Sequence, residues 1–307
     1  MIAFILRKFR ILKFLSWCEG WRSYTRHANG KWVRVKLPKG RWQYTFCADP
    51  FLFRHKEENY VFFETMTREG KGVLGCSKEV DGKWIWQGIA LEEPWHLSYP
   101  QVFDYDGRIY MIPESSRRGG GDVRLYEAVD FPLQWKMVSV LINRSFADST
   151  LLMADGRFYL ACYEVPPVCK PELWHADKLT GPWSRHPMWD KINSSRRLRR
   201  CGGQFINEDG NIYRVAQDCN GFYGKRLYRV PIVEISRNAY REGIATLIVD
   251  KNSKPKGMKH TYNRIDTPDG TLAVVDVHHD MFRPVGEIVR SLVKILMRKI
   301  VKWHVEI

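Results

Sequence analysis

Four carboxylates hold corresponding places in a repeated pattern along this chain. Asp49 and Asp148 begin two copies of the repeat, and Glu64 and Glu114 lie 15 positions after the starts of theirs. Carboxylates that converge in one concave site suit glycosyl chemistry, because a carboxylate stabilises an oxocarbenium-like centre or acts as a base. Their mutual repulsion raises at least one pKa, which a general acid needs. We therefore predict Asp49, Asp148 and Glu114 as catalytic residues and Glu64 as a substrate-binding residue.

The repeat that would bring these residues together consists of a short apolar strand, a turn and an aromatic-rich strand. Its period is about 50 residues, and its five copies start at Asp49, Tyr99, Asp148, Gly202 and Tyr262. In four copies Asp-Gly stands seven and eight positions after the start, and this pair favours a tight hairpin turn because both residues adopt positive φ. Repeats of this kind are typical of propeller blades. The sequence predicts an all-β protein, a five-bladed β-propeller over residues 31–283.

The hairpin turn also predicts which residues face one another inside a blade. Pairs three positions into the repeat are apolar in four copies: Leu52–Val61, Val102–Met111, Leu151–Leu160 and Ile265–Val274. Pairs at the start of the repeat are mostly polar: Asp49–Glu64, Tyr99–Glu114, Asp148–Tyr163, Gly202–Gln217 and Tyr262–Val277. The first copy has Lys56-Glu57 in place of Asp-Gly, so we expect a longer or different turn there. The apolar pairs should lie between blades, and the polar pairs should gather at one mouth of a central funnel.

The two ends of the chain, residues 1–30 and 284–307, carry much of the formal net charge of +15. Both interleave Lys and Arg with apolar residues, and the second does so at helical spacing. Neither holds the run of about 18 apolar residues that a membrane span needs, and the first lacks the order of a secretory signal. We predict short amphipathic helices at both termini, lying on an anionic membrane surface; the alternative is that both pack on the propeller. The expected location is cytoplasmic, peripheral on the inner face of the membrane.

Other partner classes have weaker support. The remaining charge is scattered, apart from the basic run 196–200, and no nucleic-acid-binding motif is present, so we expect no nucleic acid partner. Seven cysteines, an odd number without a C-x-x-C motif, favour a reduced protein. His278, His279 and Asp280 make a poor metal site because neighbouring strand residues point to opposite faces. We predict no metal and no cofactor.

Two families resemble this chain, and the more distant one is the clan of five-bladed arabinanases, xylosidases and invertases. The resemblance rests on Asp49-Pro50, on Asp148-Ser149, and on residues 173–177 with 181–183. In that clan the Asp of blade one is the general base, the middle Asp tunes a pKa, and a Glu of the next blade is the general acid. The matching stretch here, Cys201–Phe205, has no Glu, so the leaving oxygen would lack this proton donor.

The chain is more similar to the N-terminal domain of glucosamine inositolphosphorylceramide transferase. The similar stretches are residues 96–103, 110–115, 213–219 and 260–263 within about residues 40–280. The resemblance implies a propeller in the setting of glycan synthesis, without established catalytic residues.

These matching stretches fall where the blade register places the mouth, and their polar side chains suit hydroxyl and phosphate recognition. A run of arginines that leads into blade four could also hold a diphosphate leaving group or an anionic lipid carrier, or could be a solvated loop. With Glu64, the predicted substrate-binding residues are His96, Tyr99, Arg199, Arg200, Gln204, Arg214, Gln217, Asp218, Tyr223, His260, Tyr262 and Asn263.

Three functions remain open at this point. The first is an enzyme of surface-polysaccharide or glycolipid synthesis that transfers a sugar or phosphosugar from an activated donor to a glycan or lipid-linked glycan. The second is a non-catalytic glycan-binding module that assists a partner glycosyltransferase. The third is a furanosidase-like glycoside hydrolase with a displaced general acid. The chain has no Gly-rich nucleotide-binding loop, and its nearest Asp-x-Asp, residues 104–106, merges into a blade turn.

Overall fold

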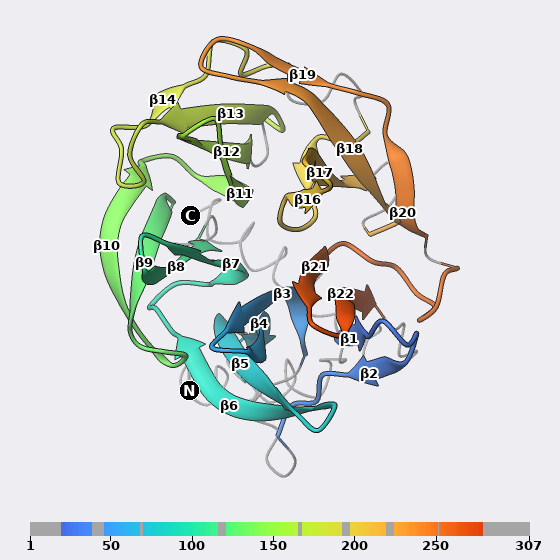
Figure 1. Ribbon diagram of the computed structural model, residues 1–307. Helices are drawn as coiled ribbons and strands as arrows, with labels where there is room; N and C mark the ends of the chain where they lie inside the picture. Colours follow the sequence, from blue (N-terminus) through green and yellow to red (C-terminus); the bar gives the residue numbers. More distant parts are fainter. Residues whose placement is uncertain are drawn as a thin grey trace, which may run out of the picture.

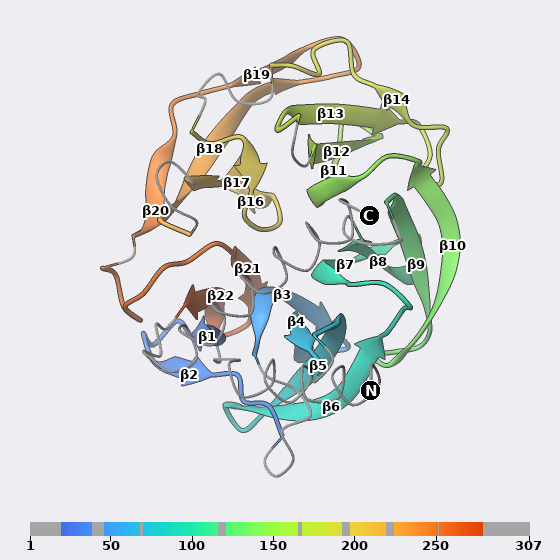
Figure 2. The ribbon, with the colours of Figure 1, turned by 180° about the vertical axis from the view of Figure 1, so that it is seen from behind.

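The computed structural model describes residues 20–38, 46–67, 70–115, 121–164, 168–191, 197–218, 224–250 and 252–278. In this part of the chain all regular structure is β, and five sheets surround a central axis (Figure 1 and, from behind, Figure 2). The predicted all-β five-bladed propeller is confirmed. No helix among these residues has the length and apolarity that crossing a membrane requires. The terminal segments predicted to be helical, residues 1–30 and 284–307, lie outside the described residues except for residues 20–30, in which Trp21–Arg26 is a strand.

The first three blades each consist of four consecutive strands that pair in chain order from the axis outward. Blade one contains β3 (Ala48–His55), β4 (Glu58–Met66), β5 (Gly72–Val80) and β6 (Lys83–Leu91). Blade two contains β7 (Ser98–Tyr105), β8 (Arg108–Glu114), β9 (Val123–Asp130) and β10 (Gln134–Ile142). Blade three contains β11 (Phe146–Ala154), β12 (Arg157–Glu164), β13 (Pro171–Ala176) and β14 (Ser184–Arg185).

Blade four is divided at its inner and outer edges. Two short inner strands, β15 (Arg200–Cys201) and β16 (Ile206–Glu208), both pair with β17 (Asn211–Asp218). The next strand, β18 (Arg226–Ile235), carries both β19 (Tyr240–Glu242) and β20 (Thr246–Asp250) on its outer side. The inner edge is therefore interrupted at residues 202–205, where the chain leaves the sheet.

Blade five joins the two ends of the chain and closes the ring. It pairs β21 (Tyr262–Thr267) and β22 (Gly270–His278) with β1 (Trp21–Arg26) and β2 (Trp32–Arg34). Strand β1 supplies hydrogen-bond partners to an edge of β22 that would otherwise be open, in a register that runs from Trp21 opposite His278 to Arg26 opposite Ala273. The propeller strands therefore begin at Trp21, earlier than the predicted boundary at residue 31.

The hairpin turns have the predicted chemistry. Asp106-Gly107, Asp155-Gly156 and Asp209-Gly210 all adopt positive φ, and Leu52–Val61, Val102–Met111 and Leu151–Leu160 pair as predicted. The first blade differs from expectation, because Lys56 and Glu57 also adopt positive φ and form a turn of the same two-residue length.

Blade five is out of the predicted register by two residues. Ile265 faces Leu272 rather than Val274, because Thr267 pairs with Gly270 and the turn residues are Pro268 and Asp269. Proline fits the first central position of a common turn, where its fixed φ is already correct. The proline therefore decides which residues form the turn.

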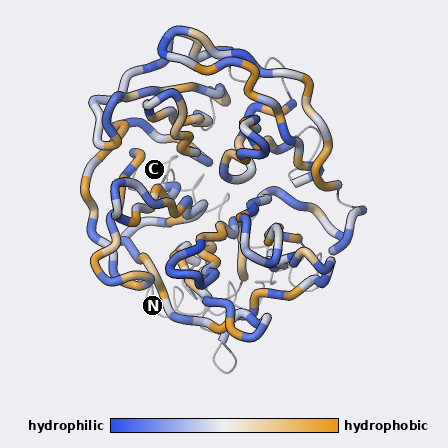
Figure 3. Tube along the Cα trace, viewed as in Figure 1, coloured by the Kyte–Doolittle hydropathy of each residue, from blue (hydrophilic) through white to orange (hydrophobic). Residues whose placement is uncertain are grey.

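The apolar pairs lie between neighbouring blades, as predicted, and the tube in Figure 3 shows apolar and polar segments interleaved in every blade. Leu52 and Val61 contact Leu272 and Val274 of blade five. Equivalent clusters join blades one and two around Val102 and Met111, and blades two and three around Leu151 and Leu160. Each fully buried side chain of this size stabilises the fold by about 1.5–3 kcal/mol, so the blades hold one another in place.

Candidate functional site

The innermost strands of the first three blades share a β-bulge at their first residues. Asp49, Tyr99 and Asp148 have φ values of 46°, 49° and 50°, in the left-handed region that is strained for a residue with a side chain. The bulge moves the expected pairing by one residue: Glu64 faces Ala48 instead of Asp49. A bulge redirects the side chain of the extra residue. The three redirected side chains lie at the end of the ring where the innermost strands begin. We call this end the site face.

The same displacement alters the other predicted pairs. Glu114 faces Ser98, and Tyr163 faces Ala147. In blade four Gln217 faces Arg200 rather than Gly202, because residues 202–205 leave the sheet. The acidic side chains nevertheless end up on one face of the ring, as the sequence predicts.

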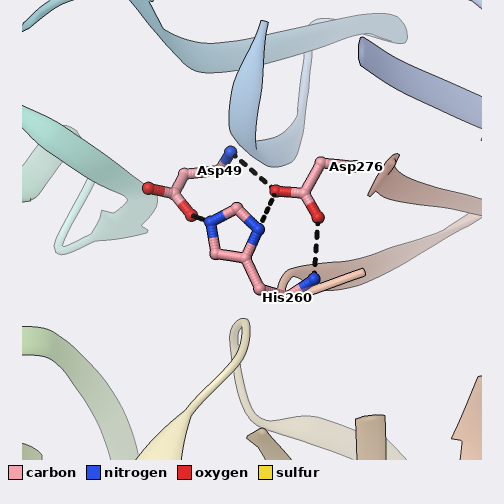
Figure 4. Close-up of side chains that lie close together, drawn as sticks. All are labelled: Asp49, His260 and Asp276. Carbon is pink, nitrogen blue, oxygen red and sulfur yellow. Dashed lines mark hydrogen bonds and ion pairs between the residues drawn. The ribbon is translucent and has the colours of Figure 1, made fainter. Parts of the chain in front are cut away.

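Three buried side chains form the first group of the site, the Asp49 triad (Asp49, His260 and Asp276; Figure 4). The His260 ring lies between the two carboxylates, with Nε2 2.9 Å from Asp49 Oδ1 and Nδ1 2.9 Å from Asp276 Oδ2. Asp276 Oδ2 also accepts the Asp49 N–H, and its Oδ1 accepts the N–H groups of His260 and Thr261. The triad therefore ties the start of blade one to blade five.

The charges in the triad follow from these contacts. Burial alone would lower the pKa of His260, but Asp276 and Asp49 raise it well above its usual value. Burial likewise favours a raised pKa for Asp49, but His260 lowers it. The ring is thus an imidazolium held by two carboxylates. The Trp21 ring contacts it at an angle of 54°, with centroids 4.0 Å apart, within the range of a cation–π attraction.

A second group, the Asp148 cluster (Asp148, Glu114, Arg200 and Gln217), joins blades two, three and four. The Asp148 carboxylate accepts hydrogen bonds from Nε and Nη2 of Arg200 and, at 2.9 Å, from Gln217 Nε2. Glu114 Oε2 accepts the Asp148 N–H at 2.9 Å and lies 4.0 Å from Arg200 Nη2. Burial raises the pKa of Asp148 to about 7, against the opposing effect of Arg200 and with the help of Glu114.

The third group on the same face is the pair of Glu64 and His96. Nδ1 of His96 accepts the Gly72 N–H at 3.0 Å, so the proton of a neutral ring lies on Nε2, which is 2.9 Å from Glu64 Oε1. Burial raises the pKa of Glu64, His96 opposes that effect, and the charge of Asp49 adds to it. Asp49 and Glu64 are therefore two neighbouring carboxyl groups whose pKa values are driven apart.

The stretch Cys201–Phe205, which has no Glu, links neighbouring blades through hydrogen bonds. The Gly203 N–H donates to the Tyr99 hydroxyl at 2.7 Å, and that hydroxyl also lies 2.9 Å from Thr150 Oγ1. The Gln204 N–H donates to Asn263 Oδ1 at 2.6 Å. Tyr99, Gln204 and Asn263 are thus placed by the structure as links between blades near the axis, each with its polar groups engaged inside the protein.

Gly203 has no room for a side chain. Its φ is +145°, and a Cβ atom there would lie 1.9 Å from the carbonyl oxygen of Tyr262. Only glycine allows the backbone of blade four to approach blade five so closely. The Tyr262 side chain itself packs against the cluster of Val275 and Val277.

Arg214 does not join these groups. It is completely buried inside blade four, where Nε lies 2.7 Å from Glu242 Oε1 and Nη2 donates to the Leu198 carbonyl. A buried guanidinium needs such a counter-charge, and Glu242 supplies it from β19. Arg214 therefore does not lie at the mouth of the funnel, where the sequence predicts it.

Asp218, which ends β17, and Arg199, which precedes β15, lie at the same end of blade four as the site. Asp218 is buried and accepts a hydrogen bond from Arg197 at 2.8 Å. Arg199 donates to the carbonyl of Cys169 at 3.4 Å. Tyr223 lies outside the described residues.

Asp276 is the one member of the site that the sequence did not single out. The predicted register places Val277 opposite the start of blade five, because it has Asp269-Gly270 as the turn. With Pro268 and Asp269 as the turn, Asp276 stands beside Thr261. The proline before Asp-Gly was the available signal.

The triad is also the group of side chains among the described residues that could hold a cation, since its ligand atoms lie within 4.8 Å of one another. Both ring nitrogens of His260 face carboxylate oxygens, however, and the raised pKa places protons where a metal would bind. A cation at this position would have to displace a ring proton. Of the predicted poor metal site, His278 ends β22, while His279 and Asp280 lie outside the described residues.

Comparison with solved structures shows the fold. The α-L-arabinanase of Cellvibrio cellulosa complexed with arabinohexaose aligns with a TM-score of 0.53 at 15% identity, over 72% of this chain and 88% of the arabinanase. The exo-β-1,3-galactanase of Phanerochaete chrysosporium with β-1,3-galactotriose aligns with a TM-score of 0.55 at 12% identity, over 85% and 69% of the two chains.

Comparison with sequences shows the family. A relative described as glucosamine inositolphosphorylceramide transferase 1 from Oryza sativa subsp. japonica is 34% identical over 255 residues, which are 78% of this chain and 34% of the relative. The protein of that description from Arabidopsis thaliana is 37% identical over 220 residues, 69% and 28% of the two chains. The chain thus spans about a third of the length of these relatives. The family model described as glucosamine inositolphosphorylceramide transferase 1, N-terminal, matches residues 34–269, and the chain belongs to this family.

Proposed function

We propose that this chain binds a carbohydrate over its site face and takes part in sugar or phosphosugar transfer during glycolipid or surface-glycan synthesis. The observation that carries the proposal is the meeting of charged and polar side chains from all five blades on one face, most of them buried, in the Asp49 triad, the Asp148 cluster and the Glu64–His96 pair. The names of the relatives, which refer to a glycolipid transferase, support the same substrate class.

Two carboxylate oxygens of the site are suited to sugar hydroxyls. Asp49 uses Oδ1 for His260 and Thr261, while no described residue donates a hydrogen bond to its Oδ2. Glu64 uses Oε1 for His96, and its Oε2 is likewise without a donor among the described residues. Carboxylate oxygens held in this way accept hydrogen bonds from ligand hydroxyl groups in a fixed geometry.

The same oxygens define roles in a transfer reaction. Asp49 stays ionised beside His260, as a general base must. The proton of the acceptor hydroxyl passes to Asp49 Oδ2, the acceptor oxygen forms a bond to the sugar, and the leaving oxygen departs with the electron pair of the broken bond. A phosphate leaving group departs without a proton, which agrees with the lack of a Glu at residues 201–205.

The second candidate function is a glycan-binding module for a partner glycosyltransferase. It is favoured by the match to the N-terminal part of the relatives, which leaves about two thirds of their length unmatched. The third, a glycoside hydrolase, would use Glu64 as its displaced acid, because burial raises the pKa of this group. We also propose a membrane-surface location, on the basis of the basic and apolar residues at both ends of the sequence.

One assay separates these functions. The full chain is incubated with a panel of sugar nucleotides, including UDP-N-acetylglucosamine, and with inositolphosphorylceramide in vesicles, and the products are measured by mass spectrometry. A glycosylated lipid that disappears with Asp49→Asn, but not with the exposed control Asp269→Asn, supports transfer. Carbohydrate binding without any consumption of donor supports the binding module, and release of free sugar from furanoside substrates supports the hydrolase.

A further inference from the structure

The two chain ends enter and leave the described part of the propeller on the site face. Trp21 opens β1 directly opposite His278, the last residue of β22. The Trp21 ring contacts His260 of the Asp49 triad, with centroids 4.0 Å apart, and also His278, at 5.1 Å. Residues 1–19 and 279–307 are therefore joined to the ring beside the candidate site and not at the opposite face.

These two sequence segments are basic and apolar. Residues 1–19 hold Arg7, Lys8, Arg10 and Lys13 against the single acid Glu19. Residues 279–307 hold six cations and three acids, interleaved with Ile, Leu and Val: Arg283, Arg290, Lys294, Arg298, Lys299 and Lys302 against Asp280, Glu287 and Glu306. A composition of this kind favours the surface of an anionic bilayer.

The connections of the propeller add positive charge to the same face. The loop that precedes blade five lies beside the chain ends, because Met258 forms a bridge with His278 and accepts its N–H at 2.8 Å. This loop presents Lys254 and Lys256 to solvent. Elsewhere on the site face, Lys36 after β2 and Lys170 before β13 are also exposed.

The opposite face, where the two-residue hairpin turns lie, has a different charge. Its turns contain the exposed acids Asp81, Asp106, Asp155, Asp209 and Asp269. All five are the Asp of an Asp-Gly turn or of the related turn at Pro268, so hairpin chemistry itself places acids there. Among the described residues, the connections of the site face therefore expose more cations than acids, whose exposed members are Glu92 and Asp190, while the turns of the second face hold more acids than cations.

We propose that the site face lies against an anionic lipid bilayer, so that the Asp49 triad and the Asp148 cluster open toward lipid headgroups. The identity of the substrate rests on the proposed function. In this orientation the substrate is the headgroup of a membrane-embedded glycolipid or lipid carrier. The occupant is a bilayer because the cations of the terminal segments alternate with apolar residues, which a polyanion such as nucleic acid would leave exposed to water.

Vesicle co-sedimentation tests the orientation. The full chain is mixed with phosphatidylcholine vesicles that contain or lack 30% phosphatidylserine, and the fraction bound is measured. The double variant Lys254→Glu/Lys256→Glu reverses two charges on the site face. The matched control Lys31→Glu/Lys178→Glu reverses two exposed charges in turns of the opposite face.

The inference predicts binding only to the anionic vesicles, a loss of at least tenfold in partitioning for the site-face variant, and a change of less than twofold for the control. Equal losses for the two variants, equal binding to both kinds of vesicle, or preferential binding to a DNA duplex added as competitor would overturn it. Vesicle binding through the site face without consumption of any donor would remove the proposed transfer but leave the orientation standing. Transfer of a sugar without vesicle binding through the site face would remove the orientation and leave the proposed transfer standing.

Discussion

Replacing Asp276 by Asn should destabilise the whole ring, because this buried side chain connects the first blade to the last. Asp276 is completely buried, pairs with His260 Nδ1, and accepts the N–H groups of Asp49, His260 and Thr261. The amide oxygen of Asn can keep the bonds to His260 N and Thr261 N. Its NH₂ group would then face the Asp49 N–H and the His260 Nδ1–H. Because all three groups are hydrogen-bond donors, the Asp49 N–H and the His260 Nδ1–H would lose their acceptor.

The expected cost follows from these losses. Removing one partner of a buried ion pair costs about 3–5 kcal/mol, and each buried donor left without an acceptor costs about 1–3 kcal/mol. Because the two effects act on the same groups and are not additive, we expect Asp276→Asn to lower the free energy of unfolding by about 3–5 kcal/mol.

Urea unfolding followed by the fluorescence of the 12 tryptophans measures this change. The matched control is Asp269→Asn, the same substitution in an exposed turn, which should change the free energy of unfolding by no more than about 0.5 kcal/mol. If Asp276→Asn stays within about 1 kcal/mol of that control, the triad does not hold blades one and five together and the reasoning fails.

Three further results follow from the same structure. Asp49→Asn should lower the transfer rate by about 10²–10⁴-fold, measured as product formed; a fall of less than tenfold would argue against a base at this position. Gly203→Ala places a methyl group 1.9 Å from the Tyr262 carbonyl oxygen at a φ of +145° and should cost about 2–6 kcal/mol in urea unfolding; an unchanged unfolding midpoint would contradict the close approach. Because burial raises the pKa of Asp148 from 3.8 to about 7 in the folded protein, the stability that this group contributes is lost as the pH rises from about 4 to about 7. Asp148→Asn should therefore flatten that part of the pH profile, and an unaltered slope would count against the burial of an ionisable Asp148.

Much of the fold could be predicted because each blade repeats the same local chemistry. In blades two and three the Asp-Gly turns fix which residues face one another, so the Val102–Met111 and Leu151–Leu160 pairs follow from the sequence. The Leu52–Val61 pair of blade one follows from the same repeat spacing. The pairing of β1 with β22 in blade five could not be predicted in this way. It joins strands that are about as far apart in the chain as two strands of this ring can be. Local patterns carry no information about such a distant partner.

The site could be predicted only in outline. Placing Asp49 and Asp148 on one face needs only the repeat, but the bulge that turns their side chains depends on backbone strain that no spacing reveals. Asp276 was hidden by a register error of two residues at Pro268. Arg214 shows the opposite error, a residue that was predicted in the site but lies outside it. It is a polar residue in a matching stretch, yet its side chain pairs with Glu242 inside blade four.

A crystal structure of the full chain soaked with glucosamine and with inositol 1-phosphate would examine the main claim most directly. Our account predicts density for a bound sugar on the site face, with a hydroxyl at about 2.6–3.2 Å from Asp49 Oδ2, and no such density in crystals of Asp49→Asn. Sugar bound only to the outer strands or to the hairpin turns of the opposite face, with nothing beside Asp49, would contradict it.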